Sequence, residues 1–351
     1  MQTKIKEKRP YEVFLIGDTG NINRHKPDPV LETLKHHLDE DQHSAVLFLG
    51  DNIYPRGLPP KSNILRADAE NALNAHHGAL KDYHGKVLFI SGNHDWNKGR
   101  KDGYEYIIRQ EKYLEKLFGQ NVMLPSNGCP GPTEINVNEN VTIVLINTQW
   151  WLQSGFRPVG KECGCRVSSE EEFFQHLIKI LDDNKNKRVI IAGHAPVYSY
   201  AIHGGRYKLS HHIFPFTIYH KKAYVPLPLI GSLLPIYRKF FGAKEDIAHP
   251  RYRHMRKRLI EIFKSHKGII YAAGHEHNLQ HITKDGNHYI VSGAGSKLKY
   301  VLQEGKNLQF GIKAKGFFKI KFENDGSAII SAWVVDAVCK EGIMLYEHKL
   351  T

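Results

Sequence analysis

Seven short apolar runs recur along the chain, each rich in β-branched or aromatic side chains and each ending in Gly or Asn. Continuous apolar runs of this length are typical of strands that are covered on both faces. Stretches with helical character lie between several of them, and this alternation predicts an α/β layered fold. The predicted strands are 11–17, 44–50, 86–92, 141–147, 188–193, 268–274 and 288–295, and the predicted helices are 28–39, 63–81, 104–118, 170–184 and 251–265.

Two regions depart from this alternation. Residues 316–323 and 327–336 alternate polar and apolar side chains more clearly and predict a hairpin near the C-terminus. Residues 206–250 are rich in His, Pro and aromatic side chains, and their prolines break any long helix. We expect one domain over 1–351, with 206–250 inserted near the face that carries the candidate site, as a lid or as an interfacial segment.

The composition is that of an ordinary globular protein, with 41% hydrophobic and 24% charged residues. No apolar run approaches the roughly 20 residues that span a bilayer. The start, "MQTKIKEKRPYEVF", is basic but has no apolar region after it, so we expect no signal peptide. This indicates either a cytoplasmic protein or the mature form of an exported one.

The formal net charge of +13 indicates a basic surface that can attract phosphate esters, nucleic acid or acidic lipid. Most Lys and Arg residues are dispersed, which weakens a dedicated nucleic-acid interpretation. The one dense cluster is "RYRHMRKR" at 251–258. It could serve a nucleic-acid substrate or simply form a solvated helix face.

The chain has four cysteines, at positions 129, 163, 165 and 339. Cys163 and Cys165 are too close in sequence to bridge each other easily, but either could pair with Cys129 in an oxidising compartment. The sequence leaves open whether that bridge forms and which partner it takes. No cysteine has zinc-ribbon spacing, so a structural zinc site is not expected.

Side chains that can bind metals follow five of the predicted strands, directly after a Gly in each case. They are Asp18; Asp51 with Tyr54; Asn93 with His94 and Asp95; His194; and His275 with His277. Ligands gather at the carboxyl ends of strands in α/β sheets, so these side chains should meet at one edge. Each alone would be an ordinary hydrogen-bonded turn residue. Their recurrence in strand order favours a shared site.

The set comprises two carboxylates, three imidazoles, one amide and one phenol. It contains oxygen and nitrogen but no thiolate, which suits iron, manganese or zinc and disfavours copper(I). The number of ligands suits a pair of ions. Asp51 lies centrally in the motif order and is the candidate for a carboxylate that bridges both.

The stretches "GDTG", "LGDNIY", "SGNHD", "AGHAPVYSYAIHGG", "GHEHNLQ" and "VSGAGSK" resemble, in order and spacing, those of the calcineurin-like metallophosphoesterases. Within them the chain is most similar to the purple acid phosphatases of the tartrate-resistant type. Most of the superfamily carries Asp-x-His in the first motif, whereas position 20 is Gly here. Tyr54 stands where purple acid phosphatases supply a phenolate. The resemblance implies a four-layer α-β-β-α sandwich of two mixed sheets flanked by helices.

The resemblance also implies how two metal ions are held. Asp18, Asp51, Tyr54 and His277 would bind the first, and Asp51, Asn93, His194 and His275 the second. The ions would be Fe³⁺ with Fe²⁺, Zn²⁺ or Mn²⁺. The implied reaction is hydrolysis of phosphomonoesters by a metal-activated hydroxide, with His94 and His203 as candidates for the residue that protonates the leaving group.

Other functions remain open at this stage. A phosphodiesterase or nuclease of the same fold is the alternative enzyme. A membrane-surface or partner-binding module is suggested by "YVPLPLIGSLLPIYRKFFG" (224–242), which is apolar and ends in basic and aromatic residues. The segment 206–250 resembles one in bacterial members of the superfamily, which favours an exported, periplasmic or outer-membrane-associated protein. The oligomeric state is left open.

Overall fold

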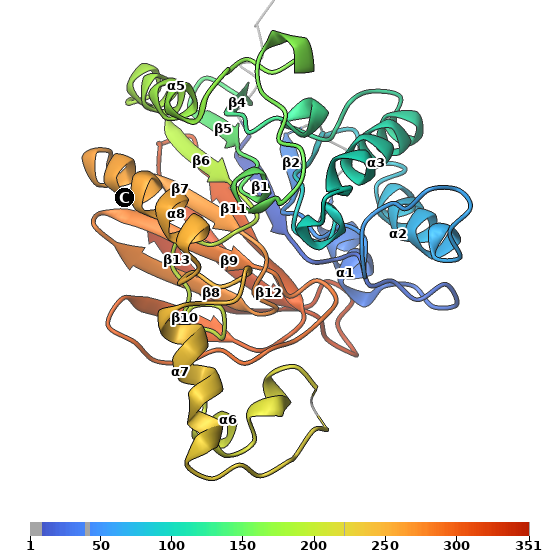
Figure 1. The fold of residues 1–351 in the computed structure, drawn as a ribbon. Coiled ribbons are helices and arrows are strands. Elements are labelled where there is room, and N and C mark those ends of the chain that lie inside the picture. Colours follow the sequence, from blue (N-terminus) through green and yellow to red (C-terminus); the bar gives the residue numbers. More distant parts are fainter. Residues whose placement is uncertain (1–8, 39–42, 221, 351) are drawn as a thin grey trace, which may run out of the picture.

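The computed structural model describes residues 9–38, 43–220 and 222–350. Two β-sheets pack face to face, and helices cover the outer side of each (Figure 1). This arrangement confirms the expected α-β-β-α sandwich of two mixed sheets. Residues 1–8 of the segment that we searched for a signal peptide, and residue 39 of the first predicted helix, lie outside the described residues.

The first sheet has six strands in the order β13-β12-β11-β1-β2-β3. Its strands are β1 (Tyr11–Ile16), β2 (Ser44–Phe48), β3 (Lys86–Phe89), β11 (Gly316–Phe322), β12 (Ala328–Val334) and β13 (Ile343–Leu350). β1, β2 and β3 run parallel, and β11 pairs with β1 in the antiparallel sense. β11 and β12 form the predicted hairpin.

The second sheet has seven strands in the order β10-β8-β9-β7-β6-β5-β4. They are β4 (Thr133–Asn136), β5 (Val141–Leu145), β6 (Arg188–Ala192), β7 (Ile270–Ala273), β8 (Leu279–Lys284), β9 (Asn287–Ser292) and β10 (Leu308–Ile312). β5, β6, β7 and β9 are parallel neighbours, and the remaining strands pair in the antiparallel sense. All seven predicted strands are therefore present, each ending one to three residues before its predicted end.

All five predicted helices are also present, with bounds that lie within three residues of the predicted ones. The helices are α1 (Pro29–His37), α2 (Arg66–Ala79), α3 (Gly103–Phe118), α4 (Gln149–Leu152), α5 (Glu170–Asp183), α6 (Leu209–Ile213), α7 (Leu233–Phe240) and α8 (Pro250–Ser265). Single 3₁₀ turns lie at Asn97–Gly99, Ser126–Gly128, Lys161–Cys163, Pro215–Ile218 and Ile230–Ser232. α1 begins where it does because the Asp28 carboxylate accepts hydrogen bonds from the first free backbone N–H groups.

Alternating side chains on each strand build three apolar layers. In β1, Val13 and Leu15 point into the space between the sheets, whereas Phe14 and Ile16 pack against α1, α2 and α3. On the other sheet, Val144 and its neighbours pack against α5 and α8. Because both faces of each sheet are covered, the central strands are continuous apolar runs, as the sequence indicated.

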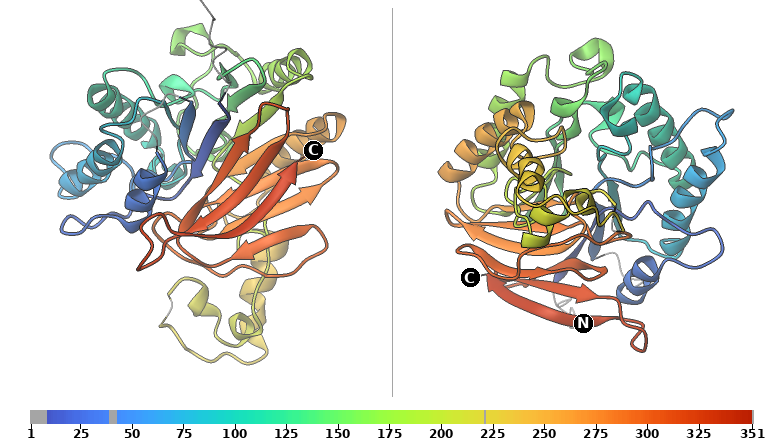
Figure 2. Two further views of the ribbon diagram at one scale, coloured as in Figure 1. Left: turned by 180° about the vertical axis from the view of Figure 1, so that it is seen from behind. Right: turned by 60° about the horizontal axis from the view of Figure 1, so that its bottom comes forward.

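Residues 209–241 contain α6 and α7 and project away from the layered body (Figures 1 and 2). We call this segment the apolar lobe; residue 221 within it is not described. No helix among the described residues is both long enough and apolar enough to span a bilayer.

A disulfide joins Cys129 to Cys165, across a Cα–Cα distance of 5.5 Å. Of the two pairings left open by the sequence, the structure selects this one. Cys163 and Cys339 are free thiols. The bridge ties the turn before β4 to the loop before α5.

Candidate metal centre

The structure brings the seven predicted metal ligands together at the carboxyl ends of the strands. Asp18, Asp51 and Asn93 follow β1, β2 and β3 of the first sheet, while His194 and His275 follow β6 and β7 of the second. Ligand atoms of Asp18, Asp51 and His194 lie within 4.8 Å of one another. The centre therefore spans both sheets at the edge where their parallel strands end.

The glycines before these residues allow the close approach. Asp18, Asp51 and His275 have φ angles of 59°, 54° and 69°, the left-handed region that non-Gly residues rarely adopt. A Cβ on Gly92 would overlap the carboxylate of Asp51, and one on Gly274 would lie 2.6 Å from Asp18 Oδ2. Unfavourable backbone conformations cluster at functional sites, where the surrounding structure holds them in place.

The first group of ligands surrounds the phenol oxygen of Tyr54. That oxygen lies 2.9 Å from Asp18 Oδ1, 3.1 Å from Asp51 Oδ2 and 3.1 Å from His277 Nε2. A phenol carries one proton, so it can donate to only one of these atoms. The remaining acceptor atoms around the Tyr54 oxygen therefore hold lone pairs that have no proton to accept. A cation bound among them would supply the missing positive charge. Nδ1 of His277 is buried and has no hydrogen-bond partner among the described residues.

The second group is formed by His194, His275 and Asn93. His194 Nδ1 donates to the Leu49 carbonyl at 2.7 Å, and His275 Nε2 donates to the Glu245 carbonyl at 2.8 Å. Because a carbonyl can only accept, the opposite nitrogen of each neutral ring carries a lone pair.

Those two lone-pair nitrogens face each other at 3.3 Å, and each lies 3.1 Å from Asn93 Oδ1. Three acceptors thus converge without a donor. Asp51 Oδ1 approaches the same point, 3.5 Å from His194 Nε2, so Asp51 contributes one oxygen to each group.

Burial and crowding also shift the pKa values of these groups. Burial raises the pKa of Asp51 well above its usual range, and the neighbouring charge of Asp18 adds to the effect. Burial and both carboxylates raise the pKa of Tyr54 well above 10. The pKa of Asp18 is about 2, because the hydrogen bond and charge of His277 outweigh the effect of burial. Bound cations would reverse the upward shifts, so the donor set fits metal ions.

Gly20 occupies the position where most of the superfamily has histidine. A Cβ there would collide with the backbone of Asn52 and Ile53. Gly20 also accepts a hydrogen bond from the Tyr54 backbone N–H at 3.1 Å. The structure therefore has no room for a side chain at position 20, and the Tyr54 hydroxyl lies beside Asp18 and Asp51.

The two candidate catalytic histidines lie on either side of the centre. His94 Nδ1 donates to the Pro55 carbonyl at 2.7 Å, which leaves Nε2 3.8 Å from Asp51 Oδ2. Burial lowers the pKa of His94 to about 3. His203 is buried, with its ring centre 4.6 Å from that of His275 and its Nδ1 2.8 Å from Asp246 Oδ1. Asp95 instead accepts backbone hydrogen bonds from Asn52 and Gly92 and braces the loops.

Sequence reasoning missed two charged residues at the centre. Glu245 Oε1 accepts from Asn93 Nδ2 at 3.0 Å, which turns the Asn93 oxygen toward the histidines. Lys297 Nζ lies 3.5 Å from the centre of the Tyr54 ring. The sequence does single out Glu245 in one respect: it is the first acidic residue after Asp183, at the end of a long stretch without a carboxylate. Lys297 ends the "VSGAGSK" motif.

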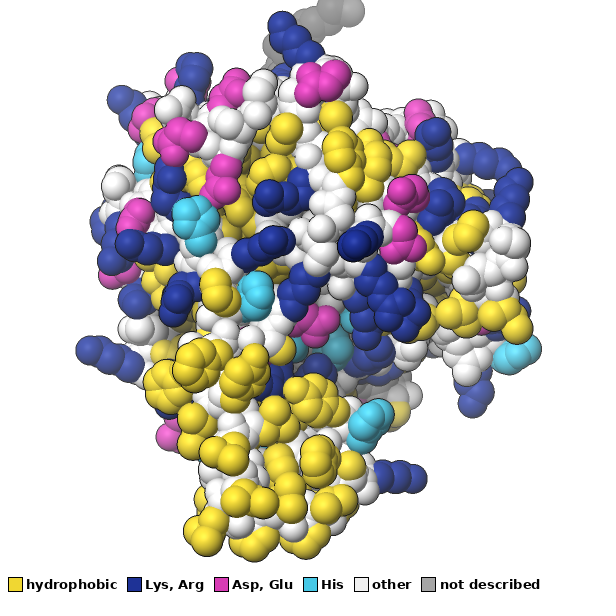
Figure 3. Space-filling view, in the orientation of Figure 1, with side chains coloured by type: hydrophobic (Ala, Val, Ile, Leu, Met, Phe, Trp, Pro, Cys, Tyr) yellow, Lys and Arg dark blue, Asp and Glu magenta, His cyan; other side chains and the backbone are white. Residues whose placement is uncertain are grey.

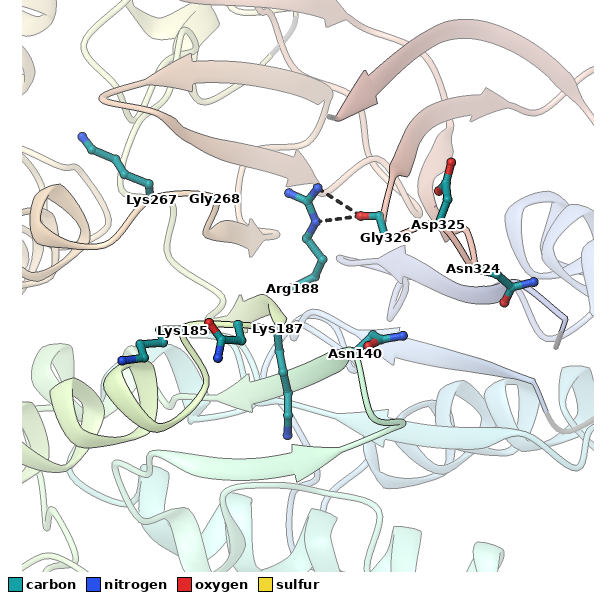
Figure 4. Close-up of a pocket in the computed structure, with 10 residues that line it drawn as sticks. Asn140, Lys185, Lys187, Arg188, Lys267, Gly268, Asn324, Asp325 and Gly326 are labelled. Atoms are coloured by element: carbon teal, nitrogen blue, oxygen red, sulfur yellow. Dashed lines mark hydrogen bonds between the residues drawn. The ribbon is translucent and has the colours of Figure 1, made fainter.

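A cavity of about 190 Å³ opens beside the second group of ligands. It is lined by Asn93, Lys98, Gln149, Leu152, His194, Ala195, Ala243, Lys244, Glu245 and His275. A wider hollow of about 500 Å³ (Figure 4) has Arg188 and Lys267 in its lining. These residues lie at or before the starts of β6 and β7, the opposite ends of the strands from the metal centre. Of these two, the smaller cavity is the one that adjoins the candidate metal centre.

The family model of the calcineurin-like phosphoesterases matches residues 11–279. The chain belongs to the calcineurin-like phosphoesterase family. The matched region contains all seven candidate ligands and both candidate catalytic histidines. A comparison with curated proteins finds no match.

Three solved structures share the fold at low sequence identity. GAP50, described as the anchor in the inner membrane complex of Plasmodium, has a TM-score of 0.59 and 17% identity over 98% of this chain and 89% of that one. Purple acid phosphatase PPD1 from yellow lupin (Lupinus luteus) seeds has a TM-score of 0.55 and 13% identity over 98% of this chain and 54% of that one. PhoD has a TM-score of 0.55 and 11% identity over 98% of this chain and 69% of that one. At these identities the likeness concerns the fold alone.

Proposed function

We propose that this chain is a binuclear metal-dependent phosphatase that hydrolyses phosphomonoesters. The observation that carries the proposal is the pair of acceptor groups that share Asp51. One surrounds the Tyr54 oxygen, and the other joins Asn93 to His194 and His275. Such pairs of oxygen and nitrogen ligands suit two cations that share a bridging carboxylate.

We assign Asp18, Asp51, Tyr54 and His277 to the first ion, and Asp51, Asn93, His194 and His275 to the second. A phenolate is a hard anionic ligand, so the first site should favour Fe³⁺, with Fe²⁺, Zn²⁺ or Mn²⁺ in the second. A tyrosine in the ligand set is what favours the purple acid phosphatase branch of the family as the assignment we propose. When bound, the two ions would lower the pKa of a water between them and neutralise charge on the phosphoryl group.

The protein's own side chains would do the remaining work. Lys297 lies over Tyr54 and offers a positive charge to the phosphate dianion. The leaving oxygen needs a proton, which an imidazole can supply. His203 is the better placed donor, because Asp246 fixes its ring through Nδ1 and leaves Nε2 to carry the transferred proton. His94 would contact the phosphate from the other side of the centre.

The alternative function is that of a phosphodiesterase or nuclease. The basic cluster at 251–258 gives it little support, because most of these side chains bond to other parts of the protein. Arg251 and Arg256 donate to backbone carbonyls of Gln153 and Val197. His254 and Arg258 pair with Glu170 and Glu171. Most of this cluster is therefore engaged in holding α8 against the body, which supports a structural role.

The test compares p-nitrophenyl phosphate with bis-p-nitrophenyl phosphate as substrates for metal-loaded protein. The proposal predicts a kcat/KM at least about tenfold higher for the monoester. His194→Ala should abolish both activities, while Asp183→Ala, far from the centre on α5, should change neither. A diester preference of tenfold or more would replace the phosphatase proposal with the phosphodiesterase.

A further inference from the structure

The apolar lobe is unusually exposed for part of a globular protein. Of the twenty-one large hydrophobic side chains that are exposed among the described residues, thirteen lie between residues 209 and 241. Leu229 and Leu233 are 92% and 66% exposed. In the space-filling view these side chains form one continuous apolar surface (Figure 3). Contiguous apolar surfaces of this kind mark sites of contact with a partner or a membrane.

Helix α7 is inverted relative to an ordinary surface helix. Its buried residues are Pro235 and Arg238, while Leu233, Tyr237 and Phe240 face outward. These outward positions are spaced by three and four residues, so they share one face of the helix. Arg238 points inward to Asp246, with Nε 2.9 Å from Oδ2. A helix that buries its arginine and exposes its leucine, tyrosine and phenylalanine is arranged to present an apolar face.

Among the charged residues of 206–244, a range that includes the apolar lobe, all are basic. Residues 206–244 contain no Asp or Glu. They contain seven basic residues, which are Arg206, Lys208, Lys221, Lys222, Arg238, Lys239 and Lys244. Lys222 and Lys239 are exposed within the lobe itself. An apolar face combined with basic residues and no carboxylate matches the chemistry of an anionic lipid surface.

We propose that the apolar lobe docks onto the surface of a lipid bilayer that contains anionic lipid. The exposed side chains of α7 and of the preceding turn enter the interfacial region, and the lysines contact the headgroups. A second copy of this chain is a poorer occupant, because each copy carries a formal charge of +13 and the lobe offers no carboxylate to the partner's lysines.

The lobe is tied directly to the metal centre. Arg238 of α7 and His203 beside the centre share the carboxylate of Asp246. Glu245, the residue before it, bonds to Asn93 and to His275. Glu245 and Asp246 lie four and five residues after the last residue of the lobe, Phe241. Docking would therefore hold the centre at a fixed position relative to the membrane surface without requiring the lobe to rearrange.

The experiment is flotation of the full chain with vesicles at low salt. One set of vesicles contains phosphatidylcholine alone, and the other contains phosphatidylcholine with phosphatidylglycerol. The triple variant L229S/L233S/F240S removes three exposed apolar side chains. The control I64S/V338S removes apolar side chains that are 91% and 93% exposed but lie outside the lobe. A second pair compares K222E/K239E with K112E/K116E, which reverses two lysines on α3.

The proposal predicts that the wild type floats with the anionic vesicles and that added salt weakens this binding. The triple variant and K222E/K239E should each bind at least about tenfold more weakly, while both controls bind as the wild type does. The proposal is overturned if the wild type does not float, or if the lobe variants float as well as the wild type. A concentration-dependent dimer without flotation, lost in the triple variant, would assign the lobe to self-association instead.

Discussion

The Nε2 atom of His194 and the Nδ1 atom of His275 lie 3.3 Å apart, and both carry lone pairs because each ring's other nitrogen donates to a backbone carbonyl. Two lone pairs that face each other at this distance repel, and a cation between the two nitrogens would relieve the repulsion. The backbone thus fixes both rings in the tautomer that a metal ligand requires. Asn93 completes the arrangement with an amide oxygen that Glu245 holds in place.

Replacing Tyr54 with phenylalanine should remove a metal ligand without removing the ring. If ferric iron is bound in the first site, the visible charge-transfer band of the protein should disappear. Tyr104→Phe, a half-buried tyrosine on α3, is the control and should leave the spectrum unchanged. Absorption spectra of iron-loaded wild type and variants make the measurement. A visible band that survives Tyr54→Phe would show that the phenol is not the ligand.

Asp51→Asn and His203→Ala should differ in two readouts. Asp51 contributes an oxygen to both groups of ligands, so Asp51→Asn should lower the metal content and reduce kcat/KM by more than about 10⁴-fold. His203→Ala should keep both ions and lose about 10²- to 10⁴-fold, the range of a missing general acid. The measurement is kcat/KM and metal content, determined on the same samples of each variant. The reverse ranking would contradict a bridging role for Asp51.

Glu245→Ala should weaken only one of the two metal sites. The substitution removes the acceptor that orients the Asn93 amide, while the backbone carbonyl that holds His275 stays. Loss of such supporting contacts typically costs about 10- to 100-fold in metal affinity. Titration of metal-free protein should show one site weakened by that factor and the other unchanged. Glu261→Ala, exposed on α8, is the control; equal weakening of both sites would argue against the assignment.

The buried His76 should make the fold sensitive to acid. Its ring packs edge-on against Phe48 and Phe89, its Nδ1 donates to the Ala72 carbonyl, and its Nε2 accepts from the Thr19 hydroxyl. Burial lowers its pKa to about 4, below the value of about 6.5 in an unfolded chain. The unfolded state therefore binds the proton first, and stability falls as the pH drops from about 6.5 to about 4, by up to about 3 kcal/mol.

Urea unfolding from about pH 7 to about pH 4.5 measures this dependence. His76→Leu should flatten the pH profile, whatever its stability at neutral pH, because the titrating group is gone. His77→Leu, the half-buried neighbour on α2, should keep the wild-type profile. If His76→Leu retains the full pH dependence, another group is responsible.

Much of the fold could be predicted because the central strands of both sheets are covered on both faces. Nearly every position of such a strand is buried, so the strand appears in the sequence as an unbroken apolar run. β8 escaped notice because its buried Gln280 and His281 are polar residues, satisfied by the Tyr200 backbone N–H and the Tyr346 hydroxyl. β13 is an edge strand whose first three residues are exposed and apolar, so it shows no alternation.

That Asp18, Asp51, Asn93, His194 and His275 meet at one edge could be predicted from the sequence, because each directly follows a strand and a glycine. Glu245 was missed, because it reaches the centre from the far end of the inserted segment and does not follow a strand. The inverted helix α7 was hidden for a different reason. Its apolar residues are typical of a core, and only the structure shows that they face outward while Arg238 is buried.

Anomalous X-ray scattering from crystals of manganese- or zinc-loaded protein would locate the metal ions themselves. A binuclear centre that shares Asp51 should give two anomalous peaks about 3.5–4 Å apart, both within bonding distance of the Asp51 carboxylate. One should lie against Tyr54 and His277, and the other against His194 and His275. A single peak, or peaks out of reach of Asp51, would contradict the account.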